Sequence, residues 1–305
     1  MTDKVIQIQG LTKRFKDFYA VNELSFDVYR GDVFGFLGPN GAGKSTTIRM
    51  ILSLISSTSG TIKIFEKSLK ESRSEILANV GAIVEKPDFY LYLPAIKNLE
   101  ILAKISGKDV PKNRLYELLE LVGLKDRAKS KVKTYSHGMK QRLGIAQTLL
   151  HNPELIVLDE PTTGLDPHGM KEIRDLIIYL SKEEKKTIFL SSHILSEIEL
   201  VANRMIIIDK GKKIVEGEVD SLLNKNSLSV TVEVNDIEKT LSVLMNTKWY
   251  ANINSSSLNK FSIVLEQKEI PVLNKFLVEN GVLVNALIPV RSLEDYFLSI
   301  TKGAK

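Results

Sequence analysis

The chain has 305 residues, 43% hydrophobic and 26% charged, which suits one large globular domain and one small one. The absence of cysteine excludes disulfides, zinc ribbons and thiol chemistry, and no apolar run reaches the length of a membrane span. The start MTDKVIQIQG lacks an apolar signal-peptide core, and the formal charge of +5 comes without a basic, aromatic-rich stripe. We therefore expect a cytoplasmic protein that does not bind nucleic acid.

A glycine-rich loop stands between a predicted strand and a predicted helix. Residues 33–37 are an apolar run, GPNGAGKS at 38–45 fits G-x-x-x-x-G-K-[ST], and helical spacing begins at Thr46. Glycines let backbone N–H groups approach phosphate oxygens, and the helix presents its positive end. This P-loop predicts that Lys44 neutralises the β- and γ-phosphates of a nucleotide and Ser45 contacts Mg²⁺. Its predicted nucleotide-binding residues are Gly38, Asn40, Gly41, Gly43, Lys44, Ser45 and Thr46.

An acidic residue stands where the next apolar segment stops. Residues 80–84 predict the end of a buried strand, Glu85 follows, and Lys86-Pro87 ends regular pairing. Taken alone, Glu85 is best interpreted as a solvated loop carboxylate, because glutamate is almost never buried unpaired.

Two carboxylates follow a fully apolar strand predicted at 155–158. Ligands bind at the carboxyl edge of open parallel sheets, so Asp159 can hold Mg²⁺ through water while Glu160 polarises the attacking water. Without the P-loop, Asp159 and Glu160 could equally be an exposed acidic turn. The presence of the P-loop favours the interpretation as a catalytic site.

A histidine ends a third predicted strand, at 187–190. A lone histidine is more often a satisfied polar residue than a catalyst, but the position of His193 at this edge predicts a hydrogen bond to the γ-phosphate. The other histidines are His137, His151 and His168, and none is spaced from His193 as a metal ligand would be. We therefore expect no transition-metal site.

Residues 221–305 are expected to form a separate small domain. Apolar spacing predicts the order βαββαβ, which gives a ferredoxin-like α+β unit. Its second helix closes at Asn280-Gly281, its last strand is predicted at 282–288, and a final helix is predicted to begin at 292–295. We see no catalytic constellation here and expect a regulatory or dimer-supporting role.

The segment YSHGMKQ at 135–141 resembles the signature sequence of ABC-type ATPases, usually written LSGGQ, and it lies about 20 residues before the strand at 155–158. Tyr135, His137 and Met139 depart from that pattern. Ser136 and Gly138 remain, and they supply the hydroxyl and the unobstructed amide that a phosphate-facing helix start needs. The resemblance covers about residues 4–218, with every motif in family order.

The resemblance implies a fold and further site residues. A mixed sheet core with a helical signature subdomain is expected over residues 1–220. Phe15 would stack on adenine, although Phe18 or Tyr19 could serve instead and core packing is the alternative. Asp166 of TTGLDP would lie near a facing subunit. Glu85 would occupy the place of the family's glutamine, where it could contact Mg²⁺ and the attacking water, so solvent exposure is no longer the favoured interpretation.

The function implied is that of an ATP-hydrolysing subunit of a membrane exporter. Two copies would meet head to tail, each ATP lying between one P-loop and the Ser136–Gly138 segment of the other copy. A separate transmembrane permease would contact a surface near residues 85–100 at the cytoplasmic face of the membrane. Glu85 with the following Pro and Phe-Tyr, SHGMKQRLGIA, SSHILSEIE and SLEDYF are similar to ATPases of bacitracin and lantibiotic export systems.

Other functions stay open. An exporter of another drug, a lipid or an ion fits the same motifs. A soluble ABC protein of ribosomes or DNA would normally fuse two ATPase halves, whereas one P-loop and one signature occur here. A GTPase or P-loop kinase would not need YSHGMKQ, and the guanine motif N-K-x-D is absent from the sequence. A purely structural nucleotide binder would leave Glu160 and His193 idle.

Overall fold

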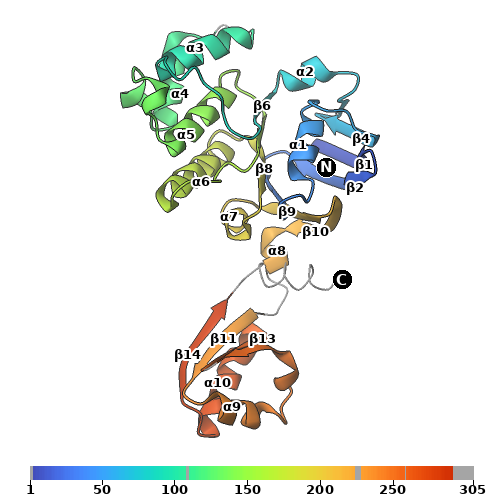
Figure 1. The fold of residues 1–305 in the computed structure, drawn as a ribbon, viewed down its shortest axis with the longest axis vertical. Coiled ribbons are helices and arrows are strands. Elements are labelled where there is room, and N and C mark those ends of the chain that lie inside the picture. The colour runs from blue at the N-terminus through green and yellow to red at the C-terminus, as the bar shows by residue number, and fades with distance from the viewer. Residues whose placement is uncertain (1–2, 108–109, 224–227, 258, 291–305) are drawn as a thin grey trace. The chain divides into compact units, whose positions relative to one another are not determined.

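The computed structural model describes residues 3–107, 110–223, 228–257 and 259–290. It divides into two compact units, Met1–Glu218 and Val219–Lys305, which are described separately (Figure 1). The final helix predicted to begin at 292–295 lies outside the described residues.

A six-stranded sheet forms the centre of the first unit. Its order is β10-β9-β3-β8-β7-β6, and all neighbours are parallel except β10 and β9. The middle strands are buried along their whole length, as expected for parallel strands covered on both faces. The strands are β3 (Val33–Leu37), β6 (Val80–Ile83), β7 (Leu155–Leu158), β8 (Thr187–Ser192), β9 (Arg204–Asp209) and β10 (Lys212–Glu218).

The strands predicted at 33–37 and 155–158 are confirmed residue for residue. The third, predicted at 187–190, continues to Ser192, because β8 pairs with β3 as far as the Leu37–Ser192 register pair. A second, antiparallel sheet has the order β2-β1-β4-β5, with β1 (Lys4–Phe15), β2 (Phe18–Tyr29), β4 (Ser59–Ile64) and β5 (Lys67–Ser68).

Four phenylalanine rings join the two sheets. Phe26 of β2 stacks on Phe34 of β3, with ring centroids 5.6 Å apart, and lies 6.1 Å from Phe189 of β8. Phe36 completes the cluster, and all four side chains are at most 4% exposed. This cluster fixes the antiparallel sheet against the sheet that carries the site.

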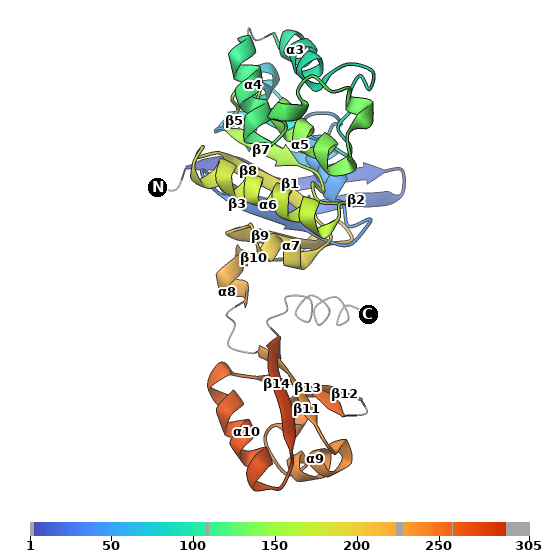
Figure 2. The ribbon, with the colours of Figure 1, turned by 90° about the vertical axis from the view of Figure 1, so that its left-hand side faces the viewer.

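Helices complete the first unit. α3, α4 and α5 pack on one another at one end, and α6 lies along the central sheet (Figures 1 and 2). The expected mixed sheet with a helical signature subdomain is thus confirmed. The helices are α1 (Lys44–Ile51), α2 (Arg73–Leu77), α3 (Ala95–Ile105), α4 (Lys112–Leu121), α5 (His137–Thr148), α6 (Pro167–Lys182) and α7 (Leu195–Glu199).

The second unit is ferredoxin-like, as predicted. After α8 (Val219–Leu223), its elements follow the order βαββαβ, and its antiparallel sheet has the strand order β12-β13-β11-β14. The last strand begins two residues later than predicted, at Val284, because its pairing with β11 starts at the Val234–Val284 register pair. The elements are β11 (Leu228–Val234), α9 (Ile237–Leu244), β12 (Ile253–Ser257), β13 (Lys260–Leu265), α10 (Ile270–Glu279) and β14 (Val284–Val290).

Replacing Phe189 by alanine should destabilise the first unit by about 3–5 kcal/mol, because it leaves a cavity among three other rings. Urea unfolding followed by far-ultraviolet circular dichroism measures this, since the single tryptophan, Trp249, lies in the other unit. Phe18→Ala is the control, because that ring is 62% exposed. Equal losses in both variants would contradict the role given to the cluster.

Candidate functional site

Parallel pairing brings four strand ends to one edge of the central sheet. The register pairs Leu37 with Ser192 and Leu158 with both Leu190 and Ile83. The backbone continues this alignment past the strands, because the N–H of Gly38 donates to the carbonyl of Ser192 at 3.3 Å. The P-loop, Asp159, Glu160, His193 and Glu85 therefore all follow strands that end at this edge.

The glycines of the P-loop answer two different constraints. A Cβ on Gly38 would lie 2.5 Å from the carbonyl oxygen of Ile208, so close packing on β9 excludes a side chain there. Gly41 and Gly43 have φ values of 81° and 105°, in the left-handed region that favours glycine. Gly43 is the residue before α1, and it offers no side-chain cap to the helix.

Gly43 therefore supplies no side-chain acceptor for the N–H groups in the first turn of α1. N–H groups at the start of a helix can bind an anion. Ser45 and Thr46 lie half-buried in that turn, and Asn40 is exposed on the loop.

Lys44 is a buried cation held by oxygen atoms. Its side chain is 5% exposed, and its Nζ donates to the carbonyls of Gly38 at 2.8 Å and Pro39 at 3.2 Å. Oε1 of Glu160 lies 3.2 Å from the same nitrogen. The two sides of the site, P-loop and β7, are thus joined through one ammonium group.

Glu160 is the most contacted carboxylate of the site. Its Oε2 accepts from Oγ1 of Thr163 at 2.9 Å and lies 3.0 Å from Nδ1 of His193. Burial raises the pKa of Glu160, but the Thr163 hydrogen bond, Lys44 and His193 outweigh it, so the net pKa lies below its ordinary value. The carboxyl group is consequently ionised at neutral pH and able to accept a proton.

Ser191 connects the two acidic residues. Its hydroxyl donates to Oδ1 of Asp159 at 2.6 Å and accepts from the backbone N–H of Glu160 at 2.9 Å. Asp159 is 3% exposed. Neither Ser191 nor Thr163 was predicted from the sequence. Parallel pairing of Leu158 with Leu190 places the following residues, Asp159 and Ser191, side by side.

Glu85 departs from expectation. Its side chain is 64% exposed and forms an ion pair with Arg49 on α1, so the prediction that it is not solvent-exposed is wrong. The physical reason is local: Glu85 has a φ of 64°, which turns the chain directly after β6 and sets the carboxylate against the guanidinium group.

The signature segment begins a helix, as predicted. Ser136 is the N-cap of α5, and its hydroxyl accepts from the N–H of Met139 at 3.2 Å. A Cβ on Gly138 would meet only Leu165, at an ordinary 3.8 Å. Within the described part of the chain, neither Ser136 nor Gly138 is hydrogen-bonded to the P-loop. Asp166 caps α6 by accepting from the N–H of Gly169 at 2.9 Å.

The aromatic candidates for adenine lie on the hairpin of β1 and β2. Phe15 is 48% exposed, so core packing is not its role, and Phe18 and Tyr19 are 62% and 45% exposed. Nζ of Lys13 lies 4.9 Å from the centre of the Phe15 ring. All three rings are therefore accessible to solvent.

Comparison with known proteins decides the family. The family model described as ABC transporter matches residues 21–163. The chain is 45% identical over 303 residues to the bacitracin transport ATP-binding protein BcrA of Bacillus licheniformis, covering 98% of each chain. The chain belongs to the ABC transporter ATP-binding proteins. This ABC protein binds ATP and hydrolyses it.

Two further likenesses cover part of this ABC protein. The lantibiotic transport ATP-binding protein SrtF of Streptococcus pyogenes is 42% identical over 224 residues, covering 73% of this chain and 95% of SrtF. A solved ATP binding subunit of an ABC transporter is 29% identical with a TM-score of 0.64, covering 72% of this chain and 91% of its own. In the described part of the ABC protein, the helices are too short or too polar to cross a membrane.

Thr163→Val should raise the pKa of Glu160, because the variant loses the hydroxyl that donates to the carboxylate. A carboxyl group with a lowered folded-state pKa stabilises the fold above its unfolded pKa, and this contribution is lost as the pH falls through the folded value. The variant should therefore also be less stable at neutral pH.

Carbon-13 NMR titration of the glutamate carboxyl groups measures the pKa, with Glu160→Gln identifying the signal. Thr163→Ser keeps the hydroxyl and should titrate as the wild type does. An unchanged pKa in Thr163→Val would contradict the assigned hydrogen bond.

Proposed function

We propose that this chain powers the export of peptide antibiotics, with bacitracin-like peptides as the first cargo class. The observation that carries the proposal is the likeness to BcrA, which spans 98% of both chains and so includes both units. The match to SrtF extends over 224 residues, close to the length of the first unit alone, Met1–Glu218. Length therefore favours the bacitracin type over the lantibiotic type.

The site residues support ATP hydrolysis through positioning and charge. We assign phosphate binding to the P-loop glycines and to Lys44, whose ammonium group lies beside the loop. Glu160, ionised and fixed by Thr163, serves as the base that polarises the attacking water. A neutral His193 that donates from Nδ1 to Glu160 has no proton on Nε2, so it can donate to the γ-phosphate only as an imidazolium ion.

Mg²⁺ is the metal that these residues fit. The hydroxyl of Ser45 and the carboxylate of Asp159 are hard oxygen donors, which Mg²⁺ prefers, and Ser191 orients Asp159 through Oδ1, leaving Oδ2 as the other donor. Bound Mg²⁺ would neutralise charge on the phosphates.

Glu85 is proposed as a further metal contact, directly or through water. Its ion pair with Arg49 joins two side chains that are 64% and 39% exposed, and exposed pairs contribute only about 0.2–1 kcal/mol. Glu85 can therefore leave Arg49 and contact a metal-bound water at a small cost in free energy.

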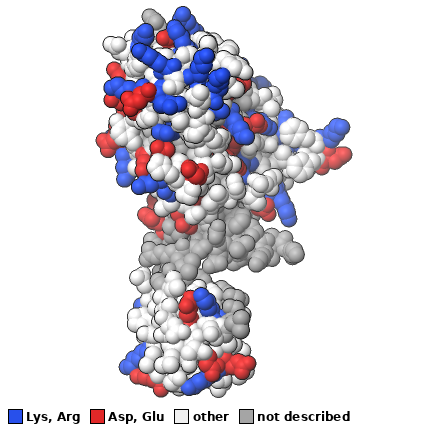
Figure 3. Space-filling model, turned by 60° about the vertical axis from the view of Figure 1, so that its left-hand side comes forward, with Lys and Arg blue, Asp and Glu red and all other residues white. Residues whose placement is uncertain are grey.

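The partners proposed are a second copy and a transmembrane permease. Ser136, Gly138 and Asp166 would face the ATP of the other copy. The permease would contact the segment 85–100 at the cytoplasmic face of the membrane, where Tyr90, Leu91 and Tyr92 are 56%, 44% and 74% exposed. Basic side chains gather at the end of the first unit formed by α3 and α4 (Figure 3). The second unit would regulate the dimer or support it.

Changes at the Arg49–Glu85 pair should alter Mg²⁺ dependence in opposite directions. Glu85→Gln should weaken the apparent Mg²⁺ affinity, because a charged ligand is lost, and Arg49→Gln should strengthen it, because Glu85 is released from its partner. Binding of a fluorescent ATP analogue across a Mg²⁺ titration measures both. The exposed pair Lys67–Glu75 provides the control, as Lys67→Gln should change nothing. Shifts of the same sign at both positions would refute the exchange.

Antibiotic resistance tests the proposed function. Coexpressed with its membrane partner in a sensitive bacterium, the chain should raise the inhibitory concentration of bacitracin more than that of a lantibiotic panel. Glu160→Gln should abolish the protection and lower ATP turnover about 10²-fold or more while keeping ATP binding, since it removes the base and not the phosphate contacts. Protection against another drug alone, or none with active ATPase, would reject the peptide cargo.

A further inference from the structure

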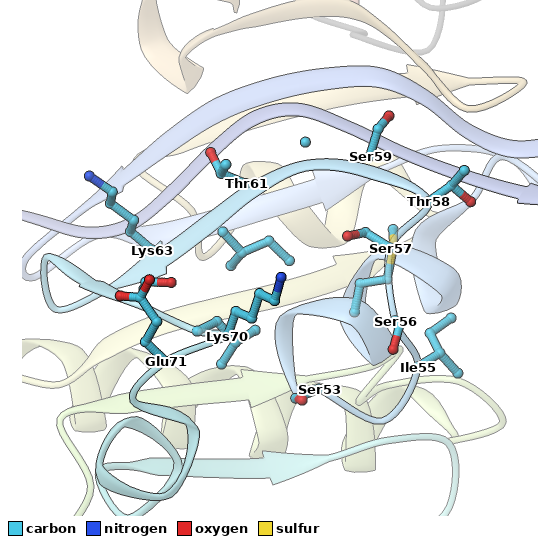
Figure 4. Close-up of a pocket in the computed structure, with 15 residues that line it drawn as sticks. Ser53, Ile55, Ser56, Ser57, Thr58, Ser59, Thr61, Lys63, Lys70 and Glu71 are labelled. Atoms are coloured by element: carbon cyan, nitrogen blue, oxygen red, sulfur yellow. The ribbon is translucent and has the colours of Figure 1, made fainter.

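The proposed ATP chemistry does not use a cavity of about 660 Å³ beside β4 (Figure 4). Its polar side chains, among them Ser57 and Lys70, are exposed to solvent, so they indicate no particular ligand. His137 is also unused by that chemistry, but its side chain has a defined partner in the structure.

His137 stands in the signature segment, where the pattern LSGGQ has a glycine. It is the first residue of α5 and directly follows the N-cap Ser136. The helix behind it is anchored by buried side chains, including Leu143 and Ile145. The imidazole ring is therefore carried by a well-fixed backbone, and its contacts depend on what lies opposite the start of α5.

The ring lies against the turn that follows the acidic strand end. Its Nε2 is 3.3 Å from the carbonyl oxygen of Thr163. A Cβ on Gly164 would be 3.6 Å from the same nitrogen, so the ring also lies beside this glycine. A Cβ on Gly138 would meet Leu165 at 3.8 Å. The first two residues of α5 thus both lie against residues 163–165.

The imidazole supplies the proton in the contact with Thr163. A backbone carbonyl oxygen can only accept, so Nε2 of His137 is the donor. Nε2 carries a proton in the imidazolium ion and in one of the two neutral tautomers, so the hydrogen bond can form in either charge state of the ring. It fixes the direction in which the carbonyl of Thr163 points.

Thr163 connects this contact to Glu160. The N–H of Thr163 donates to the carbonyl of Glu160 at 3.2 Å, and its hydroxyl donates to Oε2 of the same residue at 2.9 Å. The remaining polar group of Thr163 is its carbonyl, which His137 holds. Fixing that carbonyl restricts rotation of the peptide between residues 163 and 164, and so steadies the residue whose hydroxyl reaches the carboxylate.

The residue after Thr163 makes such a restraint useful. Gly164 has a φ of 77°, in the left-handed region, and a glycine has more conformational freedom to lose on folding than any other residue. Its own side chain cannot limit the turn. The ring of His137 limits it from a separate, helical part of the chain.

Solvent exposure limits the strength of this contact. His137 and Thr163 are both exposed, so water competes for the carbonyl oxygen. The turn also has hydrogen bonds of its own, including one from the N–H of Leu165 to the carbonyl of Thr162 at 3.2 Å. Loss of the ring should therefore loosen the turn and slow catalysis several-fold, without abolishing it.

We propose that His137 is a positioning residue, which holds Thr163 so that the threonine hydroxyl orients the carboxylate of Glu160. This inference rests on the proposed role of Glu160 as the base. It gives the histidine of the signature segment a task within its own chain, whereas Ser136 and Gly138 are proposed to face the ATP of a second copy.

Three substitutions in the full chain test the proposal. His137→Phe keeps an aromatic ring beside Gly164 but removes the donor, and His137→Gln supplies an amide N–H donor in its place. His168→Phe is the matched control, because His168 also stands in the first turn of a helix, α6, and its side chain is 82% exposed. Hydrogen exchange of the Thr163 amide is measured by NMR without nucleotide, and ATP hydrolysis gives kcat and KM.

In His137→Phe, the Thr163 amide should exchange about threefold faster and kcat should fall about threefold, while KM for ATP stays unchanged because the phosphate contacts remain. His137→Gln should restore both values towards the wild type, and His168→Phe should change neither. Added to Thr163→Val, His137→Phe should lower kcat no further, because the hydroxyl that it positions is already gone.

Unchanged exchange in His137→Phe would overturn the proposal, and so would a loss that His137→Gln fails to restore. An unchanged kcat in His137→Phe would also overturn it if Glu160→Gln is inactive. A Glu160→Gln variant that still hydrolyses ATP would instead contradict the assignment of the base, and the exchange measurement would then decide by itself whether His137 holds Thr163.

Discussion

Parallel pairing of buried strands is the constraint on which the site depends. The site residues come from four separate parts of the chain, and only the register of β3, β8, β7 and β6 brings their ends to one edge. That register is held in place by burial on both faces, including the phenylalanine cluster beneath β3 and β8. A one-residue slip between β7 and β8 would separate Asp159 from Ser191.

Within this frame, charge decides the arrangement. A buried ammonium group requires oxygen partners, and Lys44 finds them in two backbone carbonyls and Glu160. Glu160 in turn stays ionised because Thr163, Lys44 and His193 offset its burial. The P-loop and the acidic strand end therefore stabilise each other through this ammonium group.

The sequence predicted the regular parts well because they depend on local signals. Apolar runs bounded by glycine or acidic residues located β3 and β7, and a serine before a helical pattern located the start of α5. The βαββαβ order of the second unit followed from simple alternation of apolar residues. The role of each site residue remains a prediction, while their convergence at one edge is a property of the fold.

Two of the features that escaped prediction depend on contacts between distant residues. Ser191 lies 32 residues from Asp159, and Arg49 lies 36 residues from Glu85. In both cases the decisive quantity is conformational: the strand register for the first pair, and a positive φ at Glu85 for the second. Neither has a local signal in the sequence.

Gly138 has a consequence for protein engineering. Nothing in its own chain requires a glycine: its backbone is not left-handed, and a methyl group would find ordinary space beside Leu165. Alanine also favours a helix over glycine by about 0.5–1 kcal/mol. A redesign guided by the thermal stability of the single chain would therefore choose alanine here, and any need for glycine would become visible only in the assembled transporter.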